Sequence, residues 1–460
     1  MSEKKVSRRN FVKYAGAGAA VVAAAAAGAY YLTTPPPAPP TPTTTTAVET
    51  TPPPSPVTLE LWTSFAGEKP QEEFFDVFRE TVSKQYPHVS LKVTHYTGTD
   101  FLPKLTAAMG AGSPPDLFVS YGGGQLKALV DEGQTEDMTA FLSEGWAAAL
   151  IPESAKSSHT FRGKTYALPY ELNTCWLLAN KNVFKAAGVE VPTKTWNWDE
   201  FMGVTQAFKS KGKYALTISG NAPRHMVYHL DYLMERIAGQ DRFLKTLNRE
   251  AGHSFADQPF VDAFKKFAEL VAAGAFFPGA SAYKYGDIMK SLGMGEAAML
   301  CIYTWVVAPI MKDFPDAELD ILPYPTVPGG AGGPDIAAYT LGMAMAKASK
   351  NKGDAYNVLR IFAWRETMLE YAKKTGNPIA LNLGAMPAGT LNPVSQKAED
   401  LARASTKFVY RKATLMPPEL GSKYEEVVSK VFFNTMTPEE ATAALEAKAE
   451  ELKDLGILPM

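Results

Sequence analysis

Aromatic residues stand beside hydroxyl-bearing residues or glycine at three points where an apolar stretch ends, at 62–65, 96–99 and 121–124. An aromatic face covers apolar C–H groups by burial and dispersion, while hydroxyls and backbone amides hydrogen-bond to polar groups. This combination suits a polar, uncharged ligand with apolar faces, as a sugar ring has. Two more tryptophans, Trp176 and Trp305, also lie near the ends of apolar stretches. A single tryptophan more often fills a core, but we expect at least one of the three tryptophans at these places to line a site.

Signatures of catalysis and of metal binding are missing from the sequence. Gly163-Lys164-Thr165 ends like a phosphate-binding loop, but position 158 is serine where that loop needs glycine, so a hairpin explains the segment better. The six histidines form no zinc motif, although His225 and His229 are four residues apart. No Gly-x-Ser-x-Gly elbow occurs, and nothing singles out a carboxylate pair for glycoside hydrolysis. We therefore predict no catalytic residue, no metal and no cofactor.

The hydrophobic pattern from residue 57 onward alternates between the periods of strands and helices. Val57, Leu59 and Leu61 alternate with polar residues, and Phe74 and Phe78 recur at helical spacing. The predicted order is strand 57–61, helix 71–86, strand 89–93, helix 101–109, strand 116–121 and helix 122–132. This order favours an α/β fold with an open, mostly parallel, doubly wound sheet, in which ligands bind beyond the carboxyl ends of the strands.

The rest of the chain continues the mixture of strands and helices. The predicted elements are a hairpin at 161–169, strands at 170–180, 297–303 and 339–346, and helices at 193–211, 224–238, 257–273, 284–293, 353–375 and 438–452. A length of 460 residues and a hydrophobic fraction of 46% suit a large globular protein of two or three domains. The net charge of −2 provides no excess of positive charge, so we expect no nucleic-acid partner.

The first 32 residues are typical of a twin-arginine export signal. Arg8-Arg9 is followed by Phe11 and Lys13, and an uncharged, alanine-rich run extends over 14–32. Such a signal places the mature protein outside the cytoplasm, at the cell surface or in the periplasm. Cleavage near Ala27-Gly28-Ala29 and retention of the run as a membrane anchor are both open, and we favour the anchor.

A stalk follows the signal, because ten of the 24 residues in 33–56 are proline and nine are threonine. Such a segment cannot bury a core and stays extended in solvent. The sequence has two cysteines, Cys175 and Cys301. Outside the cytoplasm they form either one disulfide or two separately buried thiols, and the sequence leaves both open.

Six stretches, taken in order, give the chain a resemblance to a known family. They lie at 59–62, 112–117, 161–170, 178–201, 295–305 and 437–441, and include Gly112-Ser113-Pro114-Pro115-Asp116-Leu117 and Trp196-x-Trp198-Asp199-Glu200-Phe201. On these stretches the chain resembles the extracellular solute-binding proteins of ABC-type sugar importers, the family that includes maltose-binding protein. The resemblance extends over essentially all of 57–460.

The resemblance implies a two-lobed fold, each lobe an open doubly wound α/β sheet, with a ligand cleft between the lobes. By analogy lobe 1 comprises 57–170 and 323–380, and lobe 2 comprises 171–322 and 381–460. The implied function is extracytoplasmic capture of a sugar or small oligosaccharide and its delivery to an ATP-driven importer, with no enzymatic step. The implied partners are the carbohydrate and a membrane permease, and the binding protein itself is expected to be a monomer.

The resemblance also implies which residues contact the ligand. The matching positions are Trp62, Ser64, Asp116, Tyr121, Gly123, Tyr170, Glu171, Trp176, Asn221, Trp305 and Tyr339. Trp305 is expected to stack on a sugar ring, and Asp116 and Glu171 are expected to accept hydrogen bonds from hydroxyls. The chain departs from the family at Ala179, where many members have tyrosine.

Two alternatives stay open at this point. The same fold binds other solutes, such as a polyol phosphate, a polyamine or a metal chelate. A phosphate ligand predicts arginine or lysine at the strand ends, and none stands at the three ends described above. The other alternative is an exported carbohydrate-active enzyme, which requires two carboxylates in the cleft.

Overall fold

The computed structural model describes residues 55–405 and 408–459, which belong to one unit, Ser55–Met460. The predicted export signal at 1–32 and nearly all of the predicted stalk at 33–56 lie outside the described residues. No helix among the described residues is both long enough and apolar enough to cross a bilayer.

Three parallel strands open the described chain, and a helix follows each of them. These elements are β1 (Val57–Thr63), α2 (Lys69–Gln85), β2 (Val89–His95), α3 (Phe101–Gly110), β3 (Leu117–Ser120) and α4 (Gly123–Asp131). Val57 pairs with Val89 and Leu61 pairs with Leu117, so β1 lies between β2 and β3. The predicted strand–helix alternation is confirmed over this part of the chain.

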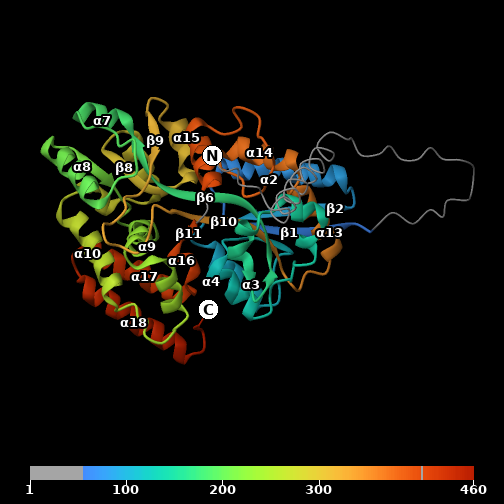
Figure 1. The fold of residues 1–460 in the computed structure, drawn as a ribbon. Helices are drawn as coiled ribbons and strands as arrows, with labels where there is room; N and C mark the ends of the chain where they lie inside the picture. Colours follow the sequence, from blue (N-terminus) through green and yellow to red (C-terminus); the bar gives the residue numbers. More distant parts are fainter. Residues whose placement is uncertain (1–54, 406–407, 460) are drawn as a thin grey trace, which may run out of the picture. The chain divides into compact units, whose positions relative to one another are not determined.

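Two long strands join the two halves of the sheet. β6 (Ala167–Asn180) pairs with β10 (Ile336–Met345) as far as Thr174, and from Cys175 onward it pairs with β8 (Ala297–Tyr303) and β9 (Leu319–Leu322). The strand order is β2-β1-β3-β10-β6-β8-β7, where β7 is Tyr214–Thr217. Figure 1 shows β6 and β10 crossing between β1 and β2 on one side and β8 and β9 on the other. The sheet is mixed, because β10 runs antiparallel to β3 and β6, and β6 runs antiparallel to β8 and β9, whereas β1 runs parallel to β2 and β3.

Short elements connect α4 to β6. They are η1 (Phe141–Ser143), α5 (Gly145–Leu150), α6 (Glu153–Lys156), η2 (Ser157–His159), β4 (Thr160–Phe161) and β5 (Lys164–Thr165). β4 and β5 form the predicted hairpin, with Gly163 at a positive φ of 76° in its turn. A positive φ is accessible to glycine without steric strain, so this segment is a turn and not a phosphate-binding loop.

Helices flank the strands of the second half. They are α7 (Lys181–Ala187), α8 (Trp198–Ser210), α9 (Pro223–Leu247), α10 (Gln258–Ala272), η3 (Pro278–Ala282), α11 (Tyr285–Gly293), η4 (Thr304–Val306) and α12 (Val307–Asp313). α8 begins later than predicted, because Asn197 and Glu200 form a capping box that fixes its first turn. α9 extends beyond the predicted helix 224–238, with a kink at Gly239, where φ is 79°.

The chain after β10 packs against both halves. The predicted helix 353–375 is two helices, α13 (Lys352–Phe362) and α14 (Arg365–Thr375), because Trp364 adopts an extended ψ of 143°. α14 packs on α2, with the rings of Tyr371 and Phe74 4.8 Å apart. The remaining elements are α15 (Pro393–Ala404), β11 (Phe408–Tyr410), α16 (Lys412–Leu415), α17 (Pro418–Phe432) and α18 (Pro438–Asp454). α15 contacts β9, while α17 and α18 pack against α10 in the second half.

Candidate functional site

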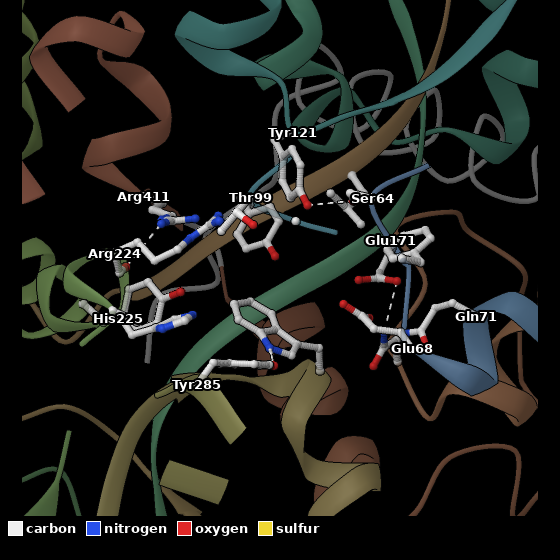
Figure 2. Close-up of a pocket in the computed structure, with 18 residues that line it drawn as sticks. Ser64, Glu68, Gln71, Thr99, Tyr121, Glu171, Arg224, His225, Tyr285 and Arg411 are labelled. Carbon is white, nitrogen blue, oxygen red and sulfur yellow. Dashed lines mark hydrogen bonds between the residues drawn. The ribbon is translucent and has the colours of Figure 1, made fainter. Parts of the chain in front are cut away.

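A cavity of about 240 Å³ lies where the two halves of the sheet face each other. Its walls come from the β1–α2, β2–α3 and β3–α4 connections, from β6 and β10, and from the first turns of α9 and α11. The lining residues are Ser64, Phe65, Glu68, Gln71, Gly98, Thr99, Tyr121, Glu171, Ala222, Arg224, His225, Tyr228, Tyr285, Trp305, Tyr339, Leu341, Asn377 and Arg411. Figure 2 shows these side chains converging on one space from both halves.

Trp305 supplies an aromatic wall of the cavity. It follows β8 in the short helix η4, and its ring stacks on Tyr303 with centroids 5.1 Å apart and planes 5° apart. The indole Nε1 donates to the hydroxyl of Tyr285 at 2.5 Å. Because Tyr303 supports one face and Tyr285 fixes the ring edge, the indole is held in place before any ligand arrives.

Carboxylate and amide groups occupy one side of the cavity. Glu171 is 2% exposed, and its oxygens accept hydrogen bonds from Asn173 at 2.6 Å, from Asn377 at 3.1 Å and from the hydroxyl of Tyr371. Burial raises the pKa of Glu171, and these three donors oppose that rise. They hold the carboxyl group at the cavity wall in one orientation.

Glu68 lies at the same side, at the N-cap of α2, and its side chain opens onto the cavity. Desolvation, followed by the charges of Glu171 and Glu72, raises the pKa of Glu68 above its ordinary value, although the residue keeps an exposed surface. Either protonation state can hydrogen-bond to a ligand hydroxyl.

A pair of hydroxyl groups, from Tyr121 and Ser64, lines another part of the cavity. The hydroxyl of Tyr121 donates to Ser64 Oγ at 2.8 Å, and Tyr339 lies beside Tyr121 with ring centroids 6.3 Å apart. Burial raises the pKa of Tyr121, so its phenol stays protonated at neutral pH. This wall offers neutral donors and acceptors.

Two arginines, Arg224 and Arg411, lie on the side opposite Glu68 and Glu171 (Figure 2). His225 stacks on Tyr285 between them and the aromatic wall, with ring centroids 4.8 Å apart. Burial, followed by the charges of the two arginines, lowers the pKa of His225 well below its ordinary value. The histidine is therefore neutral at physiological pH, and the positive charge at this side belongs to the two guanidinium groups.

The structure brings five of the eleven predicted contact residues to the cavity and places six elsewhere. Those that line it are Ser64, Tyr121, Glu171, Trp305 and Tyr339. Those outside its lining are Trp62, Asp116, Gly123, Tyr170, Trp176 and Asn221.

The partners of Trp62, Asp116 and Trp176 lie within the fold, away from the cavity. Trp62 packs edge-on against Tyr96 at 4.9 Å. Asp116 accepts from the backbone amide of Glu60 at 2.9 Å and from Ser349 Oγ at 2.6 Å. Trp176, 4% exposed, donates to Thr174 Oγ1 at 2.8 Å.

The other three serve as packing or backbone contacts. Tyr170 is fully buried against Phe362 and Tyr371. Gly123 lies at a φ of 58°, and a Cβ there would lie 2.3 Å from the carbonyl oxygen of Thr414. Asn221 is exposed, and its side-chain amide donates to the carbonyl of Ala282 at 2.8 Å.

The sequence did not predict several of the residues that line the cavity, among them Glu68, Arg224, Tyr285, Asn377 and Arg411. Glu68, Arg224 and Tyr285 share a position at or beside the first turn of a helix. In open α/β sheets these first turns face the ligand crevice. Residues at the predicted helix starts could therefore have been included among the candidate ligand contacts. Asn377 and Arg411 lie far along the chain from the strand ends, and no local pattern marks them.

The two cysteines lie on neighbouring strands as free thiols. Their sulfur atoms are 3.8 Å apart, and both side chains are buried. Among the described residues, no group of three or more histidine, cysteine, aspartate or glutamate side chains is arranged to hold a metal ion.

Comparison with known proteins decides the family. The model of the bacterial extracellular solute-binding proteins matches residues 66–365. The chain belongs to this family. The family description supports a location outside the cytoplasm and a substrate-binding role.

Relatives and solved structures agree with the assignment to the solute-binding family. The diacetylchitobiose binding protein NgcE of Streptomyces coelicolor is 26% identical over 345 residues, 70% of either chain. A putative binding protein of Brucella abortus is 23% identical over 305 residues, 66% of this chain and 71% of that protein.

The structure of a chitin oligosaccharide binding protein covers 86% of this chain and 98% of its own, with 20% identity and a TM-score of 0.79. A structure described in work on xylan utilization by the thermophilic bacterium Caldanaerobius polysaccharolyticus covers 85% of this chain and 100% of its own, with 23% identity and a TM-score of 0.78. These likenesses confirm the two-lobed α/β fold class.

Proposed function

We propose that this solute-binding protein captures a sugar or short oligosaccharide outside the cytoplasm and delivers it unchanged to the permease of an ABC importer. The observation that carries the proposal is the indole of Trp305, which Tyr303 and Tyr285 fix in place. It faces a cavity whose other walls offer carboxylates, amides and hydroxyls. An aromatic platform with convergent hydrogen-bonding groups matches the two faces of a sugar ring. Relatives named for binding diacetylchitobiose and for binding melibiose, raffinose and stachyose support the same ligand class.

Capture occurs by closure of two lobes on the ligand. Ser64, Glu68 and Tyr121 approach the cavity from the β1–β3 half, while Tyr285 and Trp305 approach it from the β7–β9 half. A ligand that touches both sets only in the closed form shifts the equilibrium toward closure. The closed form is then the state that the permease recognises.

The proposed lobes are 57–170 with 323–380, and 171–322 with 381–460. The packing of α14 on α2 supports the second segment of lobe 1, and the contact of α15 with β9 supports the second segment of lobe 2. The change of pairing partner on β6 between Thr174 and Cys175, close to the proposed boundary at 170, supports a crossing between the lobes along this strand. We further propose that the chain acts as a monomer, exported by the twin-arginine route and tethered through an uncleaved segment 1–32.

A thermal-shift screen of the purified full-length protein tests the proposal. The panel contains chitobiose, xylobiose, raffinose, melibiose, galactose and maltose, together with a polyol phosphate and a polyamine. A ligand present at 100 times its Kd adds about 2.7 kcal/mol of stability. A shift with a saccharide that is lost in Trp305→Ala and kept in Trp364→Ala supports the proposal, since Trp364 is 40% exposed and lies outside the cavity lining. A shift with the polyamine or the polyol phosphate alone contradicts it.

A carbohydrate-active enzyme is the second candidate, because Glu68 and Glu171 both line the cavity and both have a raised pKa. Glycoside hydrolysis uses such a pair as acid and base or nucleophile. The three hydrogen bonds that Glu171 accepts favour a fixed binding group instead. Incubation with chromogenic glycosides separates the two functions, because saturable binding without release of the chromophore excludes hydrolysis.

A further inference from the structure

Two positively charged side chains, Arg224 and Arg411, stand together at one side of the cavity (Figure 2), and no acidic side chain of the described residues forms an ion pair with either. We infer that the sugar recognised here carries one anionic group, a carboxylate or a phosphate, which is held by the guanidinium groups of Arg224 and Arg411. This inference rests on the proposed function and narrows its ligand from neutral sugars to acidic ones.

Arg411 is 6% exposed and follows strand β11. Its guanidinium lies 5.2 Å from the ring centroid of Tyr228, and Nη2 donates a long bond, 3.4 Å, to the backbone carbonyl of Arg224. Its Nε is buried and has no hydrogen-bond partner among residues 55–405 and 408–459. A buried guanidinium ordinarily pairs with a carboxylate, because burying an unpaired charge is costly. In the described part of the chain, no acidic group forms an ion pair with it within 4.0 Å.

Arg224 lies in the first turn of α9, and its Nη1 would lie 3.9 Å from a Cβ placed on Gly98, at the opposite wall. Its guanidinium therefore reaches across the cavity toward the β2–α3 connection. Among the described residues, Arg224 also forms no ion pair. The absence of a side chain at Gly98 leaves room beside this group for part of a ligand.

Two acidic residues of the described chain, Asp231 and Glu425, lie near the pair without an ion pair to it. Burial raises the pKa of each carboxyl group, and the charge of Arg411, joined at Glu425 by that of Arg224, opposes the rise, but neither carboxylate lies within 4.0 Å of Arg411. Asp231 accepts a hydrogen bond from Tyr424 behind the cavity wall, and neither acidic residue lines the cavity. Two adjacent cations thus face the cavity, and an anion placed between them relieves their mutual repulsion.

The opposite side of the cavity restricts where the negative charge of a ligand can sit. Glu68 and Glu171 would repel an anion and instead suit hydroxyl groups. The arrangement of arginines on one side of the cavity and carboxylates on the other therefore fits a molecule with one anionic end and one hydroxyl-bearing end. Its apolar face would lie against Trp305. A uronic acid at one end of a mono- or oligosaccharide has these three features, and its planar carboxylate matches the guanidinium fork.

Isothermal titration of the purified full-length protein tests this inference with matched ligands. Galacturonate, glucuronate and digalacturonate are compared with galactose, glucose and maltose, and glucose 6-phosphate supplies the phosphate. We expect at least tenfold tighter binding of an acidic sugar than of its neutral counterpart, weakening as salt is raised. Tighter binding of the uronates identifies the anion as a carboxylate, and tighter binding of glucose 6-phosphate identifies it as a phosphate.

Three variants assign the effect to the arginines. Arg224→Gln should weaken acidic binding at least tenfold and neutral binding less than twofold, and the charge-conserving Arg411→Lys should retain part of the preference. Arg242→Gln is the matched control, because Arg242 lies on the same helix α9 but outside the cavity. Neutral sugars that bind as tightly as acidic ones overturn the inference and leave the proposed function standing. Failure of every saccharide to bind overturns both.

Discussion

Removal of the indole at position 305 should weaken saccharide binding by roughly 70-fold. An aromatic side chain buries roughly 150–250 Å² in all, so one face presented to a sugar covers about 100 Å². At about 25 cal/mol per Å², loss of that contact costs about 2.5 kcal/mol, which converts to the stated change in Kd. Trp305 is already fixed by Tyr303 and Tyr285, so little of this energy is spent on ordering the ring.

Titration calorimetry of Trp305→Ala with the tightest saccharide of the screen measures this loss. Trp305→Phe keeps a smaller ring, and its Kd should rise tenfold or less. The Kd of Trp364→Ala should match that of the unaltered protein. Circular dichroism and the melting temperature without ligand establish that each variant is folded. A Kd for Trp305→Ala within threefold of the unaltered protein would refute the role of the indole as the ligand platform.

Three other predictions concern stability and thiol chemistry. Gly123→Ala should destabilise the protein by at least about 2 kcal/mol in urea unfolding, because a Cβ there would lie 2.3 Å from the carbonyl oxygen of Thr414 at a φ of 58°; an unchanged midpoint would contradict this. Cys175 and Cys301 should remain two free thiols in the isolated protein. Their sulfur atoms are 3.8 Å apart, but the strand register makes the two residues diagonal neighbours, whose Cα atoms generally lie about 7–8 Å apart, beyond the usual reach of a disulfide; non-reducing peptide mapping that finds a bridge would disprove it. Burial lowers the pKa of His159 to about 4, so the unfolded chain takes up its proton first as pH falls below about 6.5, and stability is lost from there down toward pH 4. His159→Gln should therefore remove about 2 kcal/mol of the stability difference between pH 7 and pH 5, and an unchanged difference would argue against a buried neutral imidazole.

Local periodicity explains why most of the fold could be predicted. The strands and helices over 57–132 follow directly from the spacing of their apolar residues, and the structure reproduces that order. The predicted helix boundaries are wrong where a local contact or backbone conformation overrides the spacing of apolar residues. Asn197 fixes the start of α8 through its capping box, and the extended backbone at Trp364 divides one apolar pattern into two helices.

The site was less accessible to sequence reasoning, because its chemistry is assembled from distant segments. Trp305 could be proposed because it stands near the end of an apolar strand with polar neighbours, and Glu171 could be proposed only from the family resemblance. Arg411 lies near the other end of the chain from Ser64, and only the return of the chain past β10 brings it to the cavity. The strand ends alone therefore suggested an uncharged ligand, although two guanidinium groups line the same space.

The contact between α4 and α16 has a mechanical consequence. Gly123 and Gly124 let the start of α4 rest directly on the backbone of Thr414 and Met416, where added Cβ atoms would lie 2.3 and 2.2 Å from the two carbonyl oxygens. Because backbone lies against backbone here, a change in the spacing of α4 and α16 cannot be absorbed by a side-chain rotamer. Arg411 stands three residues before Thr414 on the same segment. The start of α4 therefore limits how far this segment, and Arg411 with it, can move toward α4 without a clash.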